Sequence, residues 1–214
     1  MPASDWFAAI PYATIALPSP SQAGFLAIIA GGLWFLLFVS SLRFLGLPLL
    51  AWGLSTIAAF TPYDMLISSD AKRIAYRSAD GSWTMLRGDV DSYEAESWLR
   101  AQGSEQPMRS RKDALGVVPE LLCDRETCMV EREGITVLAV LRKTASGLCE
   151  SGAEVIITDR YLSCRDIPTI IDRDFTSHHG ATALRFKGGV VELTTSEHTR
   201  GHWPWTKRED NDQR

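Results

Sequence analysis

Two apolar stretches decide the fold, AGFLAIIAGGLWFLLFVSS at residues 23–41 and FLGLPLLAWGLSTIAAF at residues 44–60. Neither stretch contains Asp, Glu, Lys or Arg, and Arg43 is the one charged residue between them. A helix needs about 20 apolar residues to cross the hydrocarbon core of a bilayer, with about 17 as the lower limit. Both stretches meet this limit, so the sequence predicts a transmembrane helical hairpin over residues 23–60.

A signal peptide and a buried hairpin of a soluble protein both fit these stretches less well. A secretory signal peptide begins with a basic segment and has a single short apolar core, whereas residues 1–22 contain Asp5 and no Lys or Arg. Helices buried in a soluble protein normally carry a polar stripe. The polar side chains here, apart from two tryptophans, are Ser40, Ser41, Ser55 and Thr56. We therefore expect lipid around the hairpin, with close helix contact at three glycines, Gly24, Gly31 and Gly32.

Charge returns after the hairpin, which separates the chain into parts. We expect a flexible or interfacial segment at residues 1–22, because it is apolar but broken by Pro11, Pro18 and Pro20. Residues 64–205 are expected to form a soluble domain, and the polar end at 206–214 a disordered tail. The predicted fold class is membrane-anchored α+β, a two-helix hairpin followed by a small mixed α/β domain.

Local patterns predict the elements of this domain. Alternation of apolar and polar residues is typical of strands, and the run at 153–158 is apolar enough for a strand buried on both faces. A helix is expected from Asp91, which precedes Glu94 by three residues as in a capping box, to Gly103. A short helix is expected at 144–149. The strands are expected at residues 65–67, 73–77, 83–87, 128–132, 135–140, 153–158, 169–171, 181–186 and 190–195.

The chain contains four cysteines, Cys123, Cys128, Cys149 and Cys164, all in the predicted domain. An even number outside C-x-x-C motifs fits two disulfides in an oxidising compartment, with the pairing left open. Four reduced cysteines packed as small apolar residues are the alternative.

The charges that flank the hairpin give conflicting signals for its orientation. Arg43 in the turn would hold the turn in the cytoplasm, whereas Lys72, Arg73 and Arg77 would hold the domain there. The cysteines favour an outward-facing domain, and we follow them.

The clearest cluster of basic residues is Arg109, Arg111 and Lys112, in a polar stretch of irregular sequence. These three side chains are candidate phosphate contacts. A solvated loop is the alternative, because the net charge of the chain is −4. Nucleic-acid binding would therefore have to come from a local patch.

His178 and His179 are the strongest metal candidates, with Asp172 close by in the sequence. No second group of ligands with zinc-site spacing accompanies them. The sequence also has no nucleophile elbow and no glycine-rich phosphate loop outside the apolar stretches. We therefore predict a non-enzymatic protein without a cofactor, and no small-molecule substrate is evident.

The order of several motifs gives the chain a resemblance. These are GGLWFLLF and LRFLGLPLLAWGL in the hairpin, DMLISSDAKRIAYRSADG, EAESWLR, CDRETC, LCESGAEVIIT, Cys164, TIIDRDF with GATAL, and WPW at 203–205. In this order the chain resembles the C-terminal portion of ComEC-family competence proteins, inner-membrane channels for single-stranded DNA. It is similar to the branch that lacks an intact metallo-β-lactamase-like nuclease domain. The similarity spans most of residues 24–205.

The resemblance implies a role in DNA uptake during transformation. Family members carry a larger N-terminal part with the pore helices, so we expect a truncated or split member that forms no pore by itself. Its expected partners are membrane lipid, other parts of the competence channel and single-stranded DNA. Its expected location is the bacterial inner membrane, multi-pass, with the domain in the periplasm. Similar sequences carry more arginine around Arg43 and have cysteine at the four cysteine positions.

Nuclease activity is not implied, because the SHHGA segment at 177–181 matches only one part of the nuclease zinc site. Two alternatives stay open. One is a membrane-tethered, zinc-dependent hydrolase with His178, His179 and Asp172 as ligands. The other is a membrane-anchored interaction module unrelated to DNA.

Overall fold

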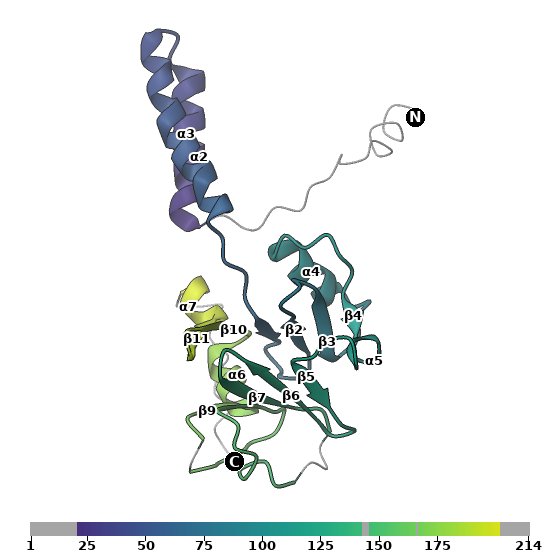
Figure 1. Cartoon of the computed structure of the whole chain (residues 1–214). Helices are drawn as coiled ribbons and strands as arrows, with labels where there is room; N and C mark the ends of the chain where they lie inside the picture. Colours follow the sequence, from purple (N-terminus) through teal and green to yellow (C-terminus); the bar gives the residue numbers. More distant parts are fainter. Residues whose placement is uncertain (1–20, 143–145, 166, 202–214) are drawn as a thin grey trace. The chain divides into compact units, whose positions relative to one another are not determined.

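The computed structural model describes residues 21–142, 146–165 and 167–201 (Figure 1). The chain divides into two compact units. Of the described residues, the first holds 21–62 and Ser97–Pro107, and the second holds Tyr63–Glu96 and those from Met108 to residue 201. The expected N-terminal segment up to residue 20, the WPW motif and the expected tail lie outside the described residues.

The first unit contains α2 (Gln22–Leu37), the 3-10 turn η1 (Ser41–Leu45) and α3 (Gly46–Ala58). Ser21 caps the N-terminus of α2, because its hydroxyl accepts a hydrogen bond from the Gly24 amide at 3.1 Å. The helix ends at Leu37, since Phe38 is extended. Pro48 lies in the first turn of α3, where its missing N–H is tolerated.

Glycines bring α2 and α3 close together. A Cβ built on Gly31 would lie 2.8 Å from the carbonyl oxygen of Gly46, and one on Gly53 would lie 2.8 Å from that of Gly24. Such spacing leaves no room for a side chain, as in closely packed membrane helices. The predicted close contact at Gly24 and Gly31 is confirmed. The same prediction for Gly32 is wrong, because a Cβ there would meet nothing within 4 Å.

One segment of the described chain, Ser41–Ala58, is long and apolar enough to cross a membrane, with 18 residues. Helix α2 has 16 residues, about 24 Å at 1.5 Å per residue, which is below the usual span. The predicted first crossing at 23–41 is shorter than expected because the chain leaves helical geometry at Phe38. A second crossing therefore stays a prediction.

The second unit contains two β-sheets. The larger has the strand order β11-β10-β1-β2-β3-β4, and its neighbours are antiparallel except for the parallel pair β3–β4. Its strands are β1 (Met65–Ile67), β2 (Ile74–Arg77), β3 (Trp83–Arg87), β4 (Arg109–Ser110), β10 (Thr182–Lys187) and β11 (Val190–Thr195).

The smaller sheet has the order β5-β6-β7-β8-β9. It begins as an antiparallel meander and becomes parallel from β7 onward. Its strands are β5 (Leu121–Cys123), β6 (Thr127–Arg132), β7 (Ile135–Val140), β8 (Val155–Ile157) and β9 (Thr169–Ile171). The short helices α5 (Arg111–Ala114), α6 (Arg173–His179) and α7 (Ser196–Arg200) complete this unit, and α4 (Tyr93–Ala101) crosses the boundary between units.

The two sheets share one core. Ile67 and Tyr76 of the larger sheet belong to the same buried cluster as Val137 and Ile157 of the smaller sheet. A second cluster lies on the other face of the smaller sheet and includes Ile156. Strand β8 is therefore buried on both faces, as its continuous apolar run predicts.

The mixed α/β character of the domain is confirmed. Each predicted strand is present, five with the predicted bounds and four with bounds shifted by one or two residues. The predicted cap at Asp91 is wrong. Ser92 accepts the hydrogen bond from the Ala95 amide instead, whereas Glu94 forms an ion pair with Arg73. The short helix expected at 144–149 is also wrong for its described part, 146–149, which is not helical.

Candidate functional site

A pocket of about 520 Å³ in the second unit is lined by five basic residues together with apolar and small polar ones. Its apolar lining includes Met85, Leu86 and Leu141, all buried. A volume of this size is within the range of ligand-binding pockets, roughly 300–1,000 Å³. The charged lining residues are Arg87, Asp89, Arg111, Lys112, Arg125 and Arg142.

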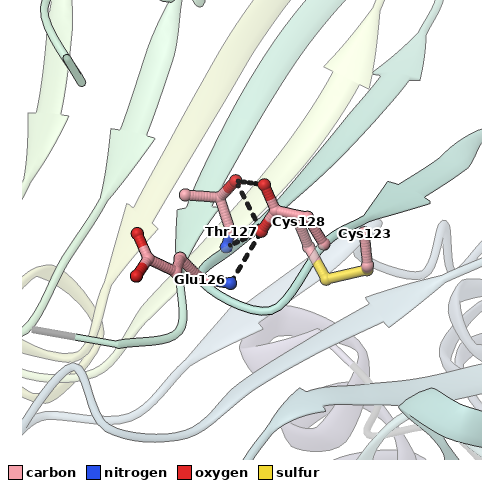
Figure 2. Close-up of a disulfide and its surroundings, with 5 residues drawn as sticks. Cys123, Glu126, Thr127 and Cys128 are labelled. Atoms are coloured by element: carbon pink, nitrogen blue, oxygen red, sulfur yellow. Dashed lines mark hydrogen bonds between the residues drawn. A yellow bond between two sulfur atoms is a disulfide. The ribbon is translucent and has the colours of Figure 1, made fainter. Parts of the chain in front are cut away.

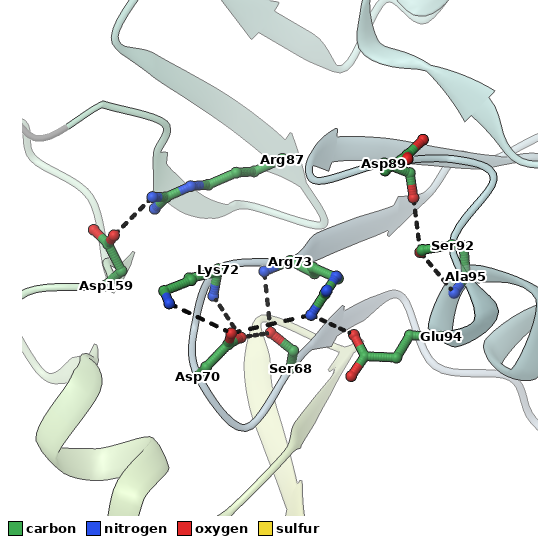
Figure 3. Close-up of polar contacts among 10 residues, drawn as sticks. All are labelled: Ser68, Asp70, Lys72, Arg73, Arg87, Asp89, Ser92, Glu94, Ala95 and Asp159. Carbon is green, nitrogen blue, oxygen red and sulfur yellow. Dashed lines mark hydrogen bonds and ion pairs between the residues drawn. The ribbon is translucent and has the colours of Figure 1, made fainter.

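Arg87 is held in place at the end of β3. Its guanidinium group donates to Asp159 at 2.7 Å and to the carbonyl oxygen of Val140 at 3.2 Å. Figure 3 shows this side chain pointing toward Asp159. The Asp159 side chain is 5% exposed and that of Arg87 18%. Arg87 therefore joins the two sheets beside the pocket, and its charge is neutralised there.

Arg111 and Lys112 reach the pocket because β4 pairs with β3. The register places Ser110 opposite Met85, so α5 begins beside the end of β3. The Ser110 hydroxyl caps α5 by accepting from the Asp113 amide at 3.4 Å. The predicted cluster is thereby divided, since Arg109 does not line the pocket and lies 3.4 Å from Asp80.

Arg125 comes from the loop between β5 and β6, which the Cys123–Cys128 disulfide closes (Figure 2). The Asp124 carboxylate in this loop accepts hydrogen bonds from the amides of Thr127 at 2.6 Å and Glu126 at 2.7 Å. These two bonds lower the pKa of Asp124, and the charge of Arg111 lowers it further. The loop therefore has a fixed shape beside the pocket.

Arg142 follows β7, and the same loop fixes its backbone. The amides of Leu141 and Arg142 both donate to the carbonyl oxygen of Glu126, at 2.7 Å and 3.2 Å. The side chain of Arg142 is exposed and lines the pocket.

We call four of the basic lining residues the basic rim, namely Arg111, Lys112, Arg125 and Arg142. Within residues 21–142, 146–165 and 167–201, three of them, Lys112, Arg125 and Arg142, have no ion-pair partner. Asp89 lines the pocket, Asp124 interacts with Arg111, and Asp159 pairs with Arg87. The pocket therefore has an excess of positive charge that an external anion can neutralise.

The lining residues include no aromatic side chain. Bases of a nucleic acid bind by stacking where aromatic rings are present. This pocket can therefore hold a phosphate group through charge and hydrogen bonding, while it lacks a stacking platform for a base. Sequence reasoning identified Arg111 and Lys112 but missed Arg125 and Arg142, which lie in separate segments. The cysteines at 123 and 128 enclose Arg125 and were the one feature of the sequence that could have drawn attention to it.

The metal candidates lie elsewhere in the second unit. Asp172 is buried at the start of α6, where it accepts from the amides of Phe175 at 2.8 Å and Leu162 at 3.2 Å. His178 is half exposed in α6, and His179 lies 2.7 Å from a carboxylate oxygen of Glu197. Among the described residues, no three His, Cys, Asp or Glu side chains are grouped so that they could hold a metal ion.

The second disulfide joins Cys149 to Cys164, which are 15 residues apart in the sequence with Cα atoms 5.5 Å apart. Cys164 packs against the outer core cluster of the smaller sheet. The two disulfides resolve the pairing that the sequence leaves open. All four cysteines are paired.

Among the features described above, the basic pocket is the one whose geometry indicates a function. Comparison with known proteins finds no matching family model, no similar curated protein and no similar solved structure.

Proposed function

We propose that the chain is a membrane-tethered accessory protein of a single-stranded DNA uptake channel, and that the basic rim contacts the phosphate backbone of the strand. The observation that carries this proposal is the set of four cations around one pocket, three of them without an acidic partner among the described residues. The ordered resemblance to the C-terminal portion of ComEC-family proteins supports it from the sequence.

The chemistry of the rim favours a linear polyanion. Lysine and arginine side chains that neutralise phosphates release the counterions condensed on the strand, and this release drives binding. Single-stranded DNA is flexible enough for successive phosphates to follow such a rim. Because the lining includes no aromatic side chain, we expect binding to depend strongly on salt and weakly on base sequence.

The remaining parts of the chain suit a tether. In this proposal α2 and α3 both cross the inner membrane, with the Arg43 turn in the cytoplasm. The segment Ser41–Ala58 supports one crossing by its length and composition. Two disulfides support a periplasmic domain, because disulfides persist in oxidising compartments. The pore would come from other parts of the competence channel, and the domain would bind the strand without cleaving it.

The test is binding of the full chain, purified in detergent with its disulfides intact, to fluorescently labelled oligothymidine. Four phosphate contacts at a slope of about 0.7 each predict that affinity falls about 50-fold between roughly 50 and 200 mM salt. The rim variant Lys112→Glu with Arg142→Glu should lose most of this affinity.

The matched control is Lys72→Glu with Lys187→Glu, which makes the same change in charge at two exposed lysines outside the pocket. Equal affinities of the rim variant and the control would overturn the proposal, as would binding of the wild-type chain that does not respond to salt. Stoichiometric zinc that is lost on His178→Ala would favour the hydrolase alternative instead.

A further inference from the structure

The loop between β5 and β6 begins and ends at a disulfide. Cys123 and Cys128 are direct cross-strand partners at the last pair of the β5–β6 ladder, with Cα atoms 4.0 Å apart. The disulfide thus closes the loop where it leaves the sheet (Figure 2). Cys128 is fully buried, whereas Cys123 is partly exposed.

Inside the closed loop, one carboxylate fixes the backbone around Arg125. The Asp124 carboxylate accepts from the amides of Glu126 and Thr127, and the Asp124 amide donates to the carbonyl oxygen of Thr127 at 2.9 Å. Arg125 is the residue between these anchored positions, and its side chain lines the pocket.

The loop also controls a second cation of the basic rim. The carbonyl oxygen of Glu126 accepts from the amides of Leu141 and Arg142. The backbone that carries Arg142 is therefore attached to the loop by these two bonds. Two of the four rim cations thus depend on the geometry of one disulfide-closed loop.

We propose that the Cys123–Cys128 disulfide is a positioning element of the basic pocket, so that binding of phosphate chains at the rim depends on the redox state of this pair. This inference rests on the proposed function, because it concerns the same pocket. With the disulfide open, hydrogen bonds alone hold the loop, so Arg125 and Arg142 sample more positions. Placing them on the rim then costs conformational entropy, and they contribute less to binding.

The opening step is thiol–disulfide exchange with an external dithiol reductant. A thiolate of the reductant attacks the sulfur of Cys123, the partly exposed partner, and the S–S bond breaks. Cys128 leaves as a thiolate and takes up a proton. The second thiolate of the reductant then releases Cys123, which is protonated in turn. The reductant ends as a disulfide, and the protein gains two electrons and two protons.

The other disulfide supplies a matched control. Cys149 lines a different pocket, of about 380 Å³, which shares no lining residue with the basic pocket. Loss of the Cys149–Cys164 disulfide removes the same kind of cross-link from the same domain. Any effect that is limited to the Cys123–Cys128 pair therefore belongs to the rim and not to the general loss of a disulfide.

The experiment measures the salt dependence of binding for the full chain and for two variants, Cys123→Ser with Cys128→Ser and Cys149→Ser with Cys164→Ser. The probes are oligothymidine and inorganic tripolyphosphate. Loss of two phosphate contacts from the first variant should reduce the oligothymidine salt slope by about 1.4. The second variant should keep the wild-type slope. Arg125→Ala should weaken binding in the oxidised wild type and change nothing in the first variant, which a purely structural disulfide would not produce.

Equal slopes in the two serine variants, or an Arg125→Ala effect that is the same with and without the disulfide, would overturn the inference while the proposed function stands. If only tripolyphosphate binds the oxidised chain, the proposed function fails and the inference is decided on that probe. If neither probe binds, both fail. Should the first variant not fold, chemical reduction of the second variant makes the same comparison, because Cys123–Cys128 is its one remaining disulfide. Its oligothymidine salt slope should fall by about 1.4 on reduction, and an unchanged slope would contradict the inference.

Discussion

Two clusters of basic residues in the same domain differ in what faces them. In the turn after β1, Arg73 lies 2.8 Å from Glu94, and Lys72 and Arg73 both lie 4.0 Å from Asp70 (Figure 3). On the basic rim, Lys112, Arg125 and Arg142 have no acidic partner among the described residues. The residue types are the same, but the first cluster is neutralised locally and the second is not.

The difference teaches that an anion site is defined by the acidic groups that are missing as much as by the basic ones present. Asp70 shows how closely the first cluster is matched. Burial raises its pKa, but the hydrogen bonds from Ser68 and Lys72 and the charges of Arg73 and Lys72 outweigh burial and lower it overall. A phosphate approaching this turn would have to compete with carboxylates already in place.

Arg87 lines the pocket but, like Arg73, is paired with a carboxylate. Removing its partner with Asp159→Ala is expected to have the largest effect on stability. Removing one partner of a buried ion pair leaves an uncompensated charge, and we expect the free energy of unfolding to fall by about 3 kcal/mol. Oligothymidine affinity should rise, because the guanidinium group of Arg87 becomes available to the ligand. Denaturant unfolding and fluorescence anisotropy measure the two effects. A stable variant with weaker binding would show that Arg87 is not neutralised in the folded chain.

Single charge reversals compare the two clusters directly. Arg142→Glu removes one rim cation and adds a repulsive charge, so we expect about tenfold weaker binding of oligothymidine, or about 1.4 kcal/mol. Lys72→Glu makes the same change in charge in the neutralised turn and should alter affinity less than twofold. The salt slope should fall only for Arg142→Glu. Similar losses for both variants would mean that the net charge of the domain, and not the rim, governs binding.

Much of the fold can be predicted from the sequence, because its strands alternate or are continuously apolar. The apolar run that contains β8 and the hairpin of β10 and β11 are examples. The segment with β4 and α5 could not be predicted in this way. It has two strand residues and four helical residues, too few for a period to show. Its place is fixed by the parallel pairing with β3, a tertiary interaction.

The same contrast between local pattern and tertiary pairing applies to the residues of the pocket. Arg111 and Lys112 can be found from the sequence because they are adjacent. Arg125 lies in the loop between β5 and β6, and Arg142 follows β7. The pairing of β5, β6 and β7 brings them to the same pocket. Arg109 shows the converse, since a residue inside the sequence cluster lies beside Asp80 instead. Sequence proximity does not fix which basic residues share a surface.

Arg109→Ala is therefore expected to have a smaller effect than any rim substitution. Exposed ion pairs contribute roughly 0–1 kcal/mol to stability, and Arg109 and Asp80 are 38% and 55% exposed. We expect less than a twofold change in oligothymidine affinity, against a severalfold loss for Lys112→Ala. Anisotropy titrations of the two variants at one salt concentration make the comparison. A larger loss for Arg109→Ala would extend the binding surface beyond the pocket.

The smallest expected effect is a shift in the pKa of one carboxyl group. It compares Asp124 beside the basic rim with Asp70 in the neutralised turn. The hydrogen bonds from Thr127 and Glu126 and the charge of Arg111 lower the pKa of Asp124 below 3.8. A lowered folded-state pKa means that Asp124 stabilises its loop above about pH 4, and that this contribution is lost as the pH falls through the folded pKa. The amide resonances of Glu126 and Thr127 should shift with that midpoint, and Asp124→Asn should abolish the transition.

Added tripolyphosphate should then distinguish the carboxylates. A phosphate bound at the basic rim competes for Arg111 and adds negative charge beside Asp124, so the midpoint of Asp124 should move to higher pH. Asp70 keeps its own partners, Lys72 and Arg73, and its midpoint should not move. By linkage, protonation of Asp124 must strengthen phosphate binding to the same extent. Equal shifts at both carboxylates would indicate diffuse screening by the anion, and an unshifted Asp124 would place the bound phosphate away from Arg111.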